Sequence, residues 1–198
     1  LNLGEPVEAV ALLERGVAND PGTVDLKVHL ALAFFSHQQF VAARAIIDFL
    51  PVMAGARNEF RRDELLVLTN FNQGNQAEAL ADARALREKW PGNLSVHKLV
   101  GSIEMAMGDL ESARSSFERG LDVAPEDISS LQHLAELDLA EEDLDAARDR
   151  YLVILELRPN DSRSMVSLAR LAARAEKHDQ ALEWLEKARS VDPDSVGA

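Results

Sequence analysis

Apolar residues recur along this chain at steps of three and four, in pairs of short stripes. One stripe consists of Val96, Leu99, Val100 and Ile103, and the next consists of Leu110, Ala113, Phe117 and Leu121. Steps of three and four place side chains on one face of an α-helix. The pattern therefore predicts pairs of amphipathic helices, and because it recurs over the whole chain, it predicts an all-α fold.

Aligned columns of residues show that the helix pairs repeat. Alanines recur at gaps of 34, 36, 34, 34 and 34 residues, at Ala9, Ala43, Ala79, Ala113, Ala147 and Ala181. A bulkier residue usually follows four positions later, as at Phe117 and Tyr151. A large aliphatic residue stands 13 positions before the alanine and is followed by a residue that is mostly small, as in Leu134-Ala135. Because a side chain larger than methyl forces close helices apart, we expect each alanine to mark the crossing inside a hairpin.

Glycine and proline mark the two ends of the predicted hairpins. Gly74 and Gly108 lie between the two stripes of their pairs, where a tight αα turn needs left-handed backbone. Prolines, which cannot continue a helix, follow the second stripe at Pro21, Pro91, Pro125, Pro159 and Pro193. Asp127 and Asp161 come next, and their carboxylates are suited to capping the following helix.

One hairpin departs from this pattern. The 36-residue gap between Ala43 and Ala79 carries two extra residues, which fall within Pro51–Glu59, and the hairpin lacks its terminal proline. We expect Pro51 to end the second helix of this hairpin early. The segment 51–55 is expected to form a loop that bends the stack.

The composition and net charge of the chain exclude several kinds of site and partner. The chain of 198 residues carries 21 Lys and Arg against 34 Asp and Glu, a formal net charge of −13 with a pI near 4.8. Such an acidic surface repels phosphate backbones, so no nucleic-acid partner is expected. The absence of cysteine excludes disulfides, thiolate zinc sites and cysteine nucleophiles. No run of 18 apolar residues occurs, so no transmembrane segment is expected.

No arrangement typical of catalysis or metal binding emerges. The sequence has no Gly-rich phosphate loop, nucleophile elbow or HExxH pair. Its five histidines are scattered over four hairpins, so we expect no metal site. Acidic residues gather between Glu136 and Asp145, but they lack the glycine and closing glutamate of an EF-hand, and a solvated helix end is expected instead. The sequence predicts a protein that is not an enzyme and holds no cofactor.

The 34-residue period, the large-small pair, the central alanine and the terminal proline together resemble the tetratricopeptide repeat (TPR) family. The resemblance implies a right-handed superhelix of antiparallel helix pairs. It implies a single array over 1–198, with a half unit at 1–21 and full units at about 22–55, 56–91, 92–125, 126–159 and 160–193. The Trp and Tyr of the family signature are missing from the first helices. Both ends fall within units, so we expect a fragment of a longer array.

The resemblance also implies that the first helix of each unit lines a concave groove that binds a protein or peptide. The residues implied to face this groove are Val28, Leu32, Phe35, Arg61, Glu64, Leu68, Phe71, Lys98, Ser102, Met105, Gln132, Glu136, Arg163 and Arg170. The N-terminal part of this set is apolar and aromatic, and the C-terminal part is polar. Phe35 and Phe71 either anchor a bound peptide or pack between hairpins. Ser102 replaces the asparagine of the carboxylate clamp found in chaperone-binding members, which disfavours a chaperone tail as partner.

A closer resemblance concerns the C-terminal part. The stretches at 134–140, 145–148 and 181–189 resemble the large TPR lipoproteins of PEP-CTERM protein-sorting and exopolysaccharide systems. This implies a scaffold in the bacterial periplasm or outer membrane, anchored by a lipid outside this chain, with the cytoplasm as the alternative. A second hypothesis is a carbohydrate-handling module of an exopolysaccharide export system. Leu182, Trp184 and Leu185 on the last helix are expected to be partly exposed or to meet another copy of the chain.

Overall fold

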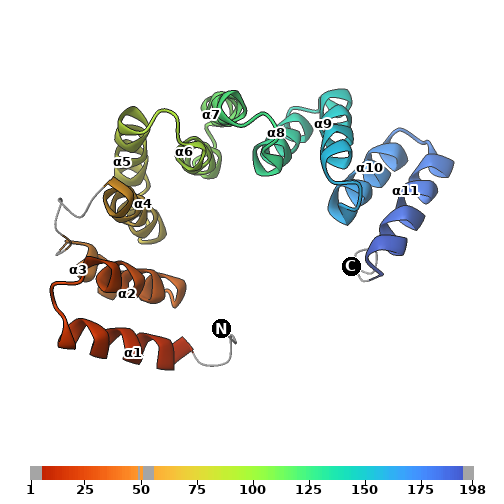
Figure 1. Cartoon of the computed structure of the whole chain (residues 1–198). Helices are drawn as coiled ribbons and strands as arrows, with labels where there is room; N and C mark the ends of the chain where they lie inside the picture. The colour runs from red at the N-terminus through yellow and green to blue at the C-terminus, as the bar shows by residue number, and fades with distance from the viewer. Residues whose placement is uncertain (1–5, 49, 51–55, 194–198) are drawn as a thin grey trace. The chain divides into compact units, whose positions relative to one another are not determined.

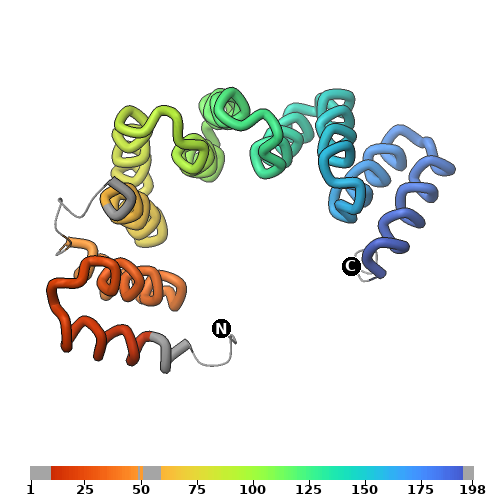
Figure 2. Tube along the Cα trace, in the orientation of Figure 1, coloured from red at the N-terminus to blue at the C-terminus, as the bar shows by residue number. Residues whose placement is uncertain are grey.

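The computed structural model describes residues 6–48, 50 and 56–193, which Figure 1 draws as ribbons and Figure 2 as a tube. Eleven α-helices and no β-strand lie within these ranges. They are α1 (Pro6–Asn19), α2 (Val24–Ser36), α3 (Phe40–Asp48), α4 (Ala56–Asn72), α5 (Gln76–Lys89), α6 (Leu94–Ala106), α7 (Leu110–Val123), α8 (Ile128–Ala140), α9 (Leu144–Leu157), α10 (Ser162–Arg174) and α11 (His178–Val191). The all-α prediction is confirmed.

The helices pack as sequential pairs. Helix α2 packs on α3, α4 on α5, α8 on α9 and α10 on α11, with a short turn inside each pair. The chain divides into two compact units. The N-terminal unit holds residues 1–91 and 102–107, and the C-terminal unit holds residues 92–101 and 108–198, so the division passes through α6.

The alanine column marks the close contacts of the hairpins, as predicted. Ala43, Ala79, Ala113 and Ala147 are fully buried, and Ala181 is 7 % exposed. The bulky residues four positions later are buried at Ile47, Phe117 and Tyr151. In the C-terminal unit, Ala147 and Tyr151 belong to one apolar cluster with residues of α8 and α10. This cluster joins the hairpin of α8 and α9 to α10 of the next hairpin.

Left-handed backbone recurs at one position of the repeat, in the turn between the two helices. Gly74 and Gly108 have φ angles of +86° and +82°, which confirms the role predicted for them. Residues without glycine's freedom occupy the same position in three other hairpins, where φ is +58° at Gln38, +64° at Glu142 and +59° at Glu176. A side chain with a Cβ is strained in this conformation.

Replacing one of these residues by glycine should therefore stabilise the fold. We expect Glu176→Gly to raise the free energy of unfolding by about 1 kcal/mol, because the strain of left-handed backbone is removed at an exposed turn. Urea unfolding followed by circular dichroism measures the change. Glu183→Gly, an exposed position inside α11, is the matched control and should cost about 1 kcal/mol. Equal effects of the two substitutions would contradict this explanation.

The helices end before the prolines and begin after the aspartates, as the sequence predicts. Helices α5, α7 and α9 each end two residues before a proline of the proline column. Asp127 and Asp161 cap α8 and α10 by accepting hydrogen bonds from the backbone N–H of Ser130 (2.8 Å) and Ser164 (2.9 Å). Asp109 and Asp143 cap α7 and α9 in the same way. The exposed carboxylate of Asp143 thus belongs to a helix start.

The helices on either side of the irregular interval differ in length from the other helices. Helix α3 has 9 residues, whereas α1, α5, α7, α9 and α11 have 14 each. Helix α4 has 17 residues, whereas α2, α6, α8 and α10 have 13 each. Residues 56–59 of the interval that holds the insertion are therefore helical. The predicted loop at 51–55 lies outside the described residues.

Side chains at the end of α5 hold the longer α4 in place. Lys89 forms ion pairs with Glu59 in the additional turn and with Asp63, whose Oδ2 is 3.2 Å from its Nζ. The rings of Phe60 and Trp90 meet edge to face, with centroids 6.0 Å apart. These contacts join the start of α4 to the end of α5.

Candidate functional site

The first helices of the N-terminal unit present an apolar surface. Leu32 and Phe35 of α2 and Leu68 and Phe71 of α4 are all half-buried. Leu32 and Phe35 pack against a cluster that contains Ala31, Ala43, Ile47 and Leu65. The ring of Phe35 also meets that of Phe40 edge to face, at 5.4 Å between centroids. Phe35 therefore contributes to hairpin packing and keeps part of its side chain accessible.

Other residues of the groove set in this unit differ in accessibility. Val28 is 2 % exposed, so its side chain belongs to the core. On α6, Met105 is half-buried and Ser102 is exposed. Arg61 and Glu64 are half-buried on α4. Burial raises the pKa of Glu64, and the charge of Arg61 acts in the opposite direction. A hydrogen-bond donor from a ligand would stabilise this carboxylate.

The corresponding residues of the C-terminal unit are polar. The Nζ of Lys98 lies 3.2 Å from Oδ1 of Asp127, the residue that caps α8. Burial acts to raise the pKa of Asp127, but hydrogen bonds with Ser130 and Lys98 lower it on balance. Lys98 thus supports a helix start. Gln132 is half-buried, and Glu136, Arg163 and Arg170 are exposed.

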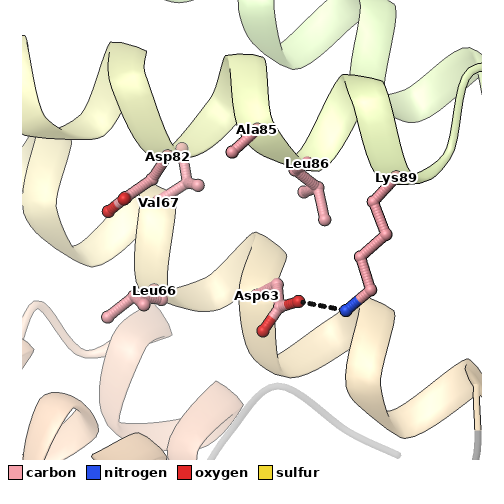
Figure 3. A pocket seen from close by; sticks show the side chains of 7 residues that line it. All are labelled: Asp63, Leu66, Val67, Asp82, Ala85, Leu86 and Lys89. Carbon is pink, nitrogen blue, oxygen red and sulfur yellow. Dashed lines mark hydrogen bonds and ion pairs between the residues drawn. The ribbon is translucent and has the colours of Figure 1, made fainter.

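Figure 3 shows a pocket of about 220 Å³ between α4 and α5 of the N-terminal unit. Leu66, Val67 and Leu86 supply apolar lining, and Lys89 pairs with Asp63 at one end. At the other end, Asp82 accepts a hydrogen bond of 3.0 Å from the amide of Asn70. The charged groups of this pocket are therefore satisfied by one another or by neighbouring side chains.

A buried polar column, which consists of Asn70, Glu104 and Asp138 at one position of the repeat, was not predicted. The exposed fractions of these residues are 3 %, 2 % and 2 %. Each of them contacts an arginine from the second helix of the preceding hairpin. Arg44 donates to Asn70 at 2.6 Å, Arg84 pairs with Glu104 at 2.7 Å, and Arg114 pairs with Asp138 at 2.7 Å. The 34-residue spacing of three polar residues is the sequence signal that could have revealed the column.

The prediction of a solvated helix end is wrong for Asp138. Its carboxylate is buried and is shared by Arg114 of α7 and by Arg150 of α9, whose Nε is 2.6 Å away. Burying a charge is favourable only when it is paired and hydrogen-bonded. Asp138 therefore joins consecutive hairpins.

Neither a metal site nor a membrane-spanning helix occurs in the described part of the chain. Among those residues, no group of three or more His, Asp or Glu side chains could hold a metal ion. None of the helices found there combines the length and the apolar content that crossing a bilayer requires.

Comparisons with known proteins identify the repeat. Family models described as tetratricopeptide repeat match residues 65–128 and 128–194, so together they span about two thirds of the chain. No curated protein sequence matches the chain.

Several solved structures are similar in fold. The pilF protein of Pseudomonas aeruginosa aligns with 20 % identity and a TM-score of 0.73, over 98 % of this chain and 88 % of that one. A TPR repeat-containing protein from Cytophaga hutchinsonii gives 18 % identity and a TM-score of 0.74, over 94 % and 74 %. MamA from Desulfovibrio magneticus gives 15 % identity and a TM-score of 0.69, over 86 % and 96 %. With sequential helix pairs, a TPR-like fold and family matches over residues 65–194, the chain belongs to the tetratricopeptide repeat family.

Proposed function

We propose that this chain is a non-catalytic scaffold that binds a protein or peptide on the first-helix face of its N-terminal unit. We define this face by Leu32, Phe35, Arg61, Glu64, Leu68, Phe71 and Met105. The observation that carries the proposal is the row of partly accessible apolar side chains on α2 and α4 beside a half-buried carboxylate. Apolar and aromatic anchors supply most of the binding energy at protein interfaces.

The family supports this proposal, because tetratricopeptide repeats typically act as interaction scaffolds. One similar structure is that of Cut9–Hcn1, a hetero-tetramer of the APC/C, in which 98 % of this chain matches 39 % of the other with 15 % identity. We also propose that the units run as one array over the boundaries given by the sequence, from the half unit at 1–21 to the last full unit at 160–193.

Leu68→Ser combined with Phe71→Ser should abolish partner recovery. The test is chemical cross-linking of the tagged chain in the source cells, followed by purification and mass spectrometry. We expect proteins captured by the wild type to fall at least tenfold, because two apolar anchors are lost. Circular dichroism verifies that the variant is folded.

Val41→Ser is the matched control, because Val41 is 79 % exposed on α3, a second helix. It should leave recovery unchanged. Equal recovery by the wild type and the Leu68/Phe71 variant would refute a role for this face. Binding of the chain to a glycan array without a protein partner would instead favour the carbohydrate-handling alternative, for which the face offers phenylalanine but no Trp or Tyr.

We further propose a bacterial envelope setting, in a protein-sorting or exopolysaccharide assembly. Its support is the resemblance of residues 134–140, 145–148 and 181–189 to the PEP-CTERM-associated lipoproteins. Cell fractionation with an antibody against the chain tests it, and recovery in the soluble cytoplasmic fraction alone would contradict it. Self-association through α11 remains a proposal too, supported by the 59 % exposure of Leu182.

A further inference from the structure

The C-terminal unit contains a pocket of about 110 Å³ between the start of α9, the end of α10 and the start of α11. Leu171 and Ala172 of α10 and Trp184 of α11 give it an apolar lining. Its charged lining consists of two cations, Arg148 on α9 and Lys177 directly before α11, and one carboxylate, Asp145, which pairs with Arg148. All of these residues belong to the C-terminal unit, whereas the residues of the first-helix face belong to the N-terminal unit.

One repeat earlier in the sequence, the same place is filled by ion pairs. The correspondences at a spacing of 34 residues are Arg148 with Arg114, Ala172 with Asp138, Ala175 with Glu141, Lys177 with Asp143 and Trp184 with Arg150. In that earlier place, Arg114 lies 2.7 Å from Asp138 and 3.0 Å from Glu141. The pocket therefore keeps one arginine of the network and replaces its two carboxylates by alanines, while a lysine replaces the capping residue Asp143.

Arg148 has only weak substitutes for the missing carboxylates. It pairs with Asp145 at 2.7 Å and with Asp149 at 2.8 Å, both on its own helix. The side chains of these aspartates are 85 % and 66 % exposed. Ion pairs as exposed as these contribute little stability. A carboxylate that enters the pocket can therefore compete for the guanidinium group.

The start of α11 lacks a second interaction that the earlier hairpin has. Asp143 caps α9 through the backbone N–H of Ala146 at 3.0 Å. Its counterpart Lys177 forms no side-chain cap on α11. The first backbone N–H groups of a helix favour an anion. The two cations and the uncapped helix start therefore favour negative charge at this pocket, against the single carboxylate of Asp145 in its lining.

We propose that this pocket binds an acidic side chain, Asp or Glu, of a protein partner. The carboxylate takes the place that Asp138 and Glu141 hold in the preceding network, and the neighbouring apolar side chains of the partner contact Leu171 and Trp184. A cavity of roughly 150 Å³ holds a benzene ring, so a pocket of about 110 Å³ takes a single side chain of this size.

The proposal is independent of the first-helix face, because the two sites share no residue. A partner could use both, but loss of either site leaves the residues of the other unchanged. The pocket also differs from that face in chemistry, because it binds a charged group and buries a single side chain of the partner.

The test is an NMR titration of the ¹⁵N-labelled chain with the peptide acetyl-Leu-Asp-Leu-amide, which copies the residues around Asp138. We expect shifts of the Trp184 indole N–H and of backbone amides in the first turns of α9 and α11. The matched peptide acetyl-Leu-Asn-Leu-amide should bind at least tenfold more weakly, because a hydrogen bond to a charged group is lost. A third peptide, acetyl-Leu-Asn-Leu with a free carboxyl terminus, distinguishes a terminal carboxylate from a side chain.

Two variants locate the binding. Arg148→Gln should weaken the aspartate peptide about tenfold or more. Ala175→Glu, which places the chain's own carboxylate where Glu141 stands one repeat earlier, should weaken it at least fivefold by competition. Arg119→Gln, at an exposed arginine of α7, should leave it unchanged. Equal binding of the aspartate and asparagine peptides, an unaffected Arg148→Gln variant, or binding of the free-terminus peptide alone would each overturn the proposal.

Discussion

Phe117→Ala should lower the free energy of unfolding by ~3–5 kcal/mol, because it leaves a cavity where a fully buried ring was. Phe117 occupies the bulky column next to Ala113 and stacks on His133 of the next hairpin, at 4.6 Å between ring centroids. The ring also lies against Gly101, so the cavity would be lined by α6, α7 and α8. For a chain of this length the loss corresponds to roughly 6–20 °C in Tm, measured by circular dichroism or calorimetry.

A double-mutant cycle with Gly101 isolates the cause. A Cβ built on Gly101 would lie 3.0 Å from two atoms of the Phe117 ring, which is too close for an unstrained contact. Gly101→Ala should therefore destabilise the wild type and be better tolerated in the Phe117→Ala background, where its methyl group enters the cavity. Additive effects of the two substitutions would show that the ring and the glycine are not in this contact.

Asp138→Ala should lower the free energy of unfolding by about 3 kcal/mol, because it leaves Arg114 and Arg150 without their buried partner. The value is at the lower end of the range for such changes, since the two arginine side chains are 23 % and 25 % exposed and retain contact with water. Chemical unfolding measures the loss. Hydrogen exchange should show it concentrated at α8 and at its contacts with α7 and α9.

The matched control is Asp145→Ala, which removes an aspartate that is 85 % exposed in an ion pair on the surface. It should change the free energy of unfolding by less than about 0.5 kcal/mol. If Asp138→Ala is as mild as this control, the buried polar column does not hold the hairpins together.

The regular features of the fold could be predicted because they depend on local sequence. Gly74 and Gly108 mark turns through their backbone freedom, and Asp127 caps a helix through its own short side chain. The alanine column repeats with the hairpin, so its close packing follows from the spacing alone. The residues of the first-helix face were derived from the family resemblance, and their role in binding stays a prediction.

The irregular features depended on contacts between residues distant in sequence. In the first turns of α4, Glu59 pairs with Lys89 and Phe60 meets Trp90, each about 30 residues away in the sequence. The hairpin pattern does not reveal that pairing, so the sequence placed the two extra residues only within Pro51–Glu59.

The sequence by itself determined the helices, their turns and the period of the stack. The helices follow from the spacing of apolar residues at three and four positions, and the turns follow from glycine, proline and capping residues. The tertiary structure decided which charges are buried. Asp138 and Asp145 lie in the same acidic stretch of the sequence, yet the first is buried between two arginines and the second is 85 % exposed. It also decided that a pocket lies beside Ala172, whereas Asp138, at the same position one repeat earlier, forms an ion pair with Arg114. The effect of a side chain's charge depends on the neighbours that packing places around it.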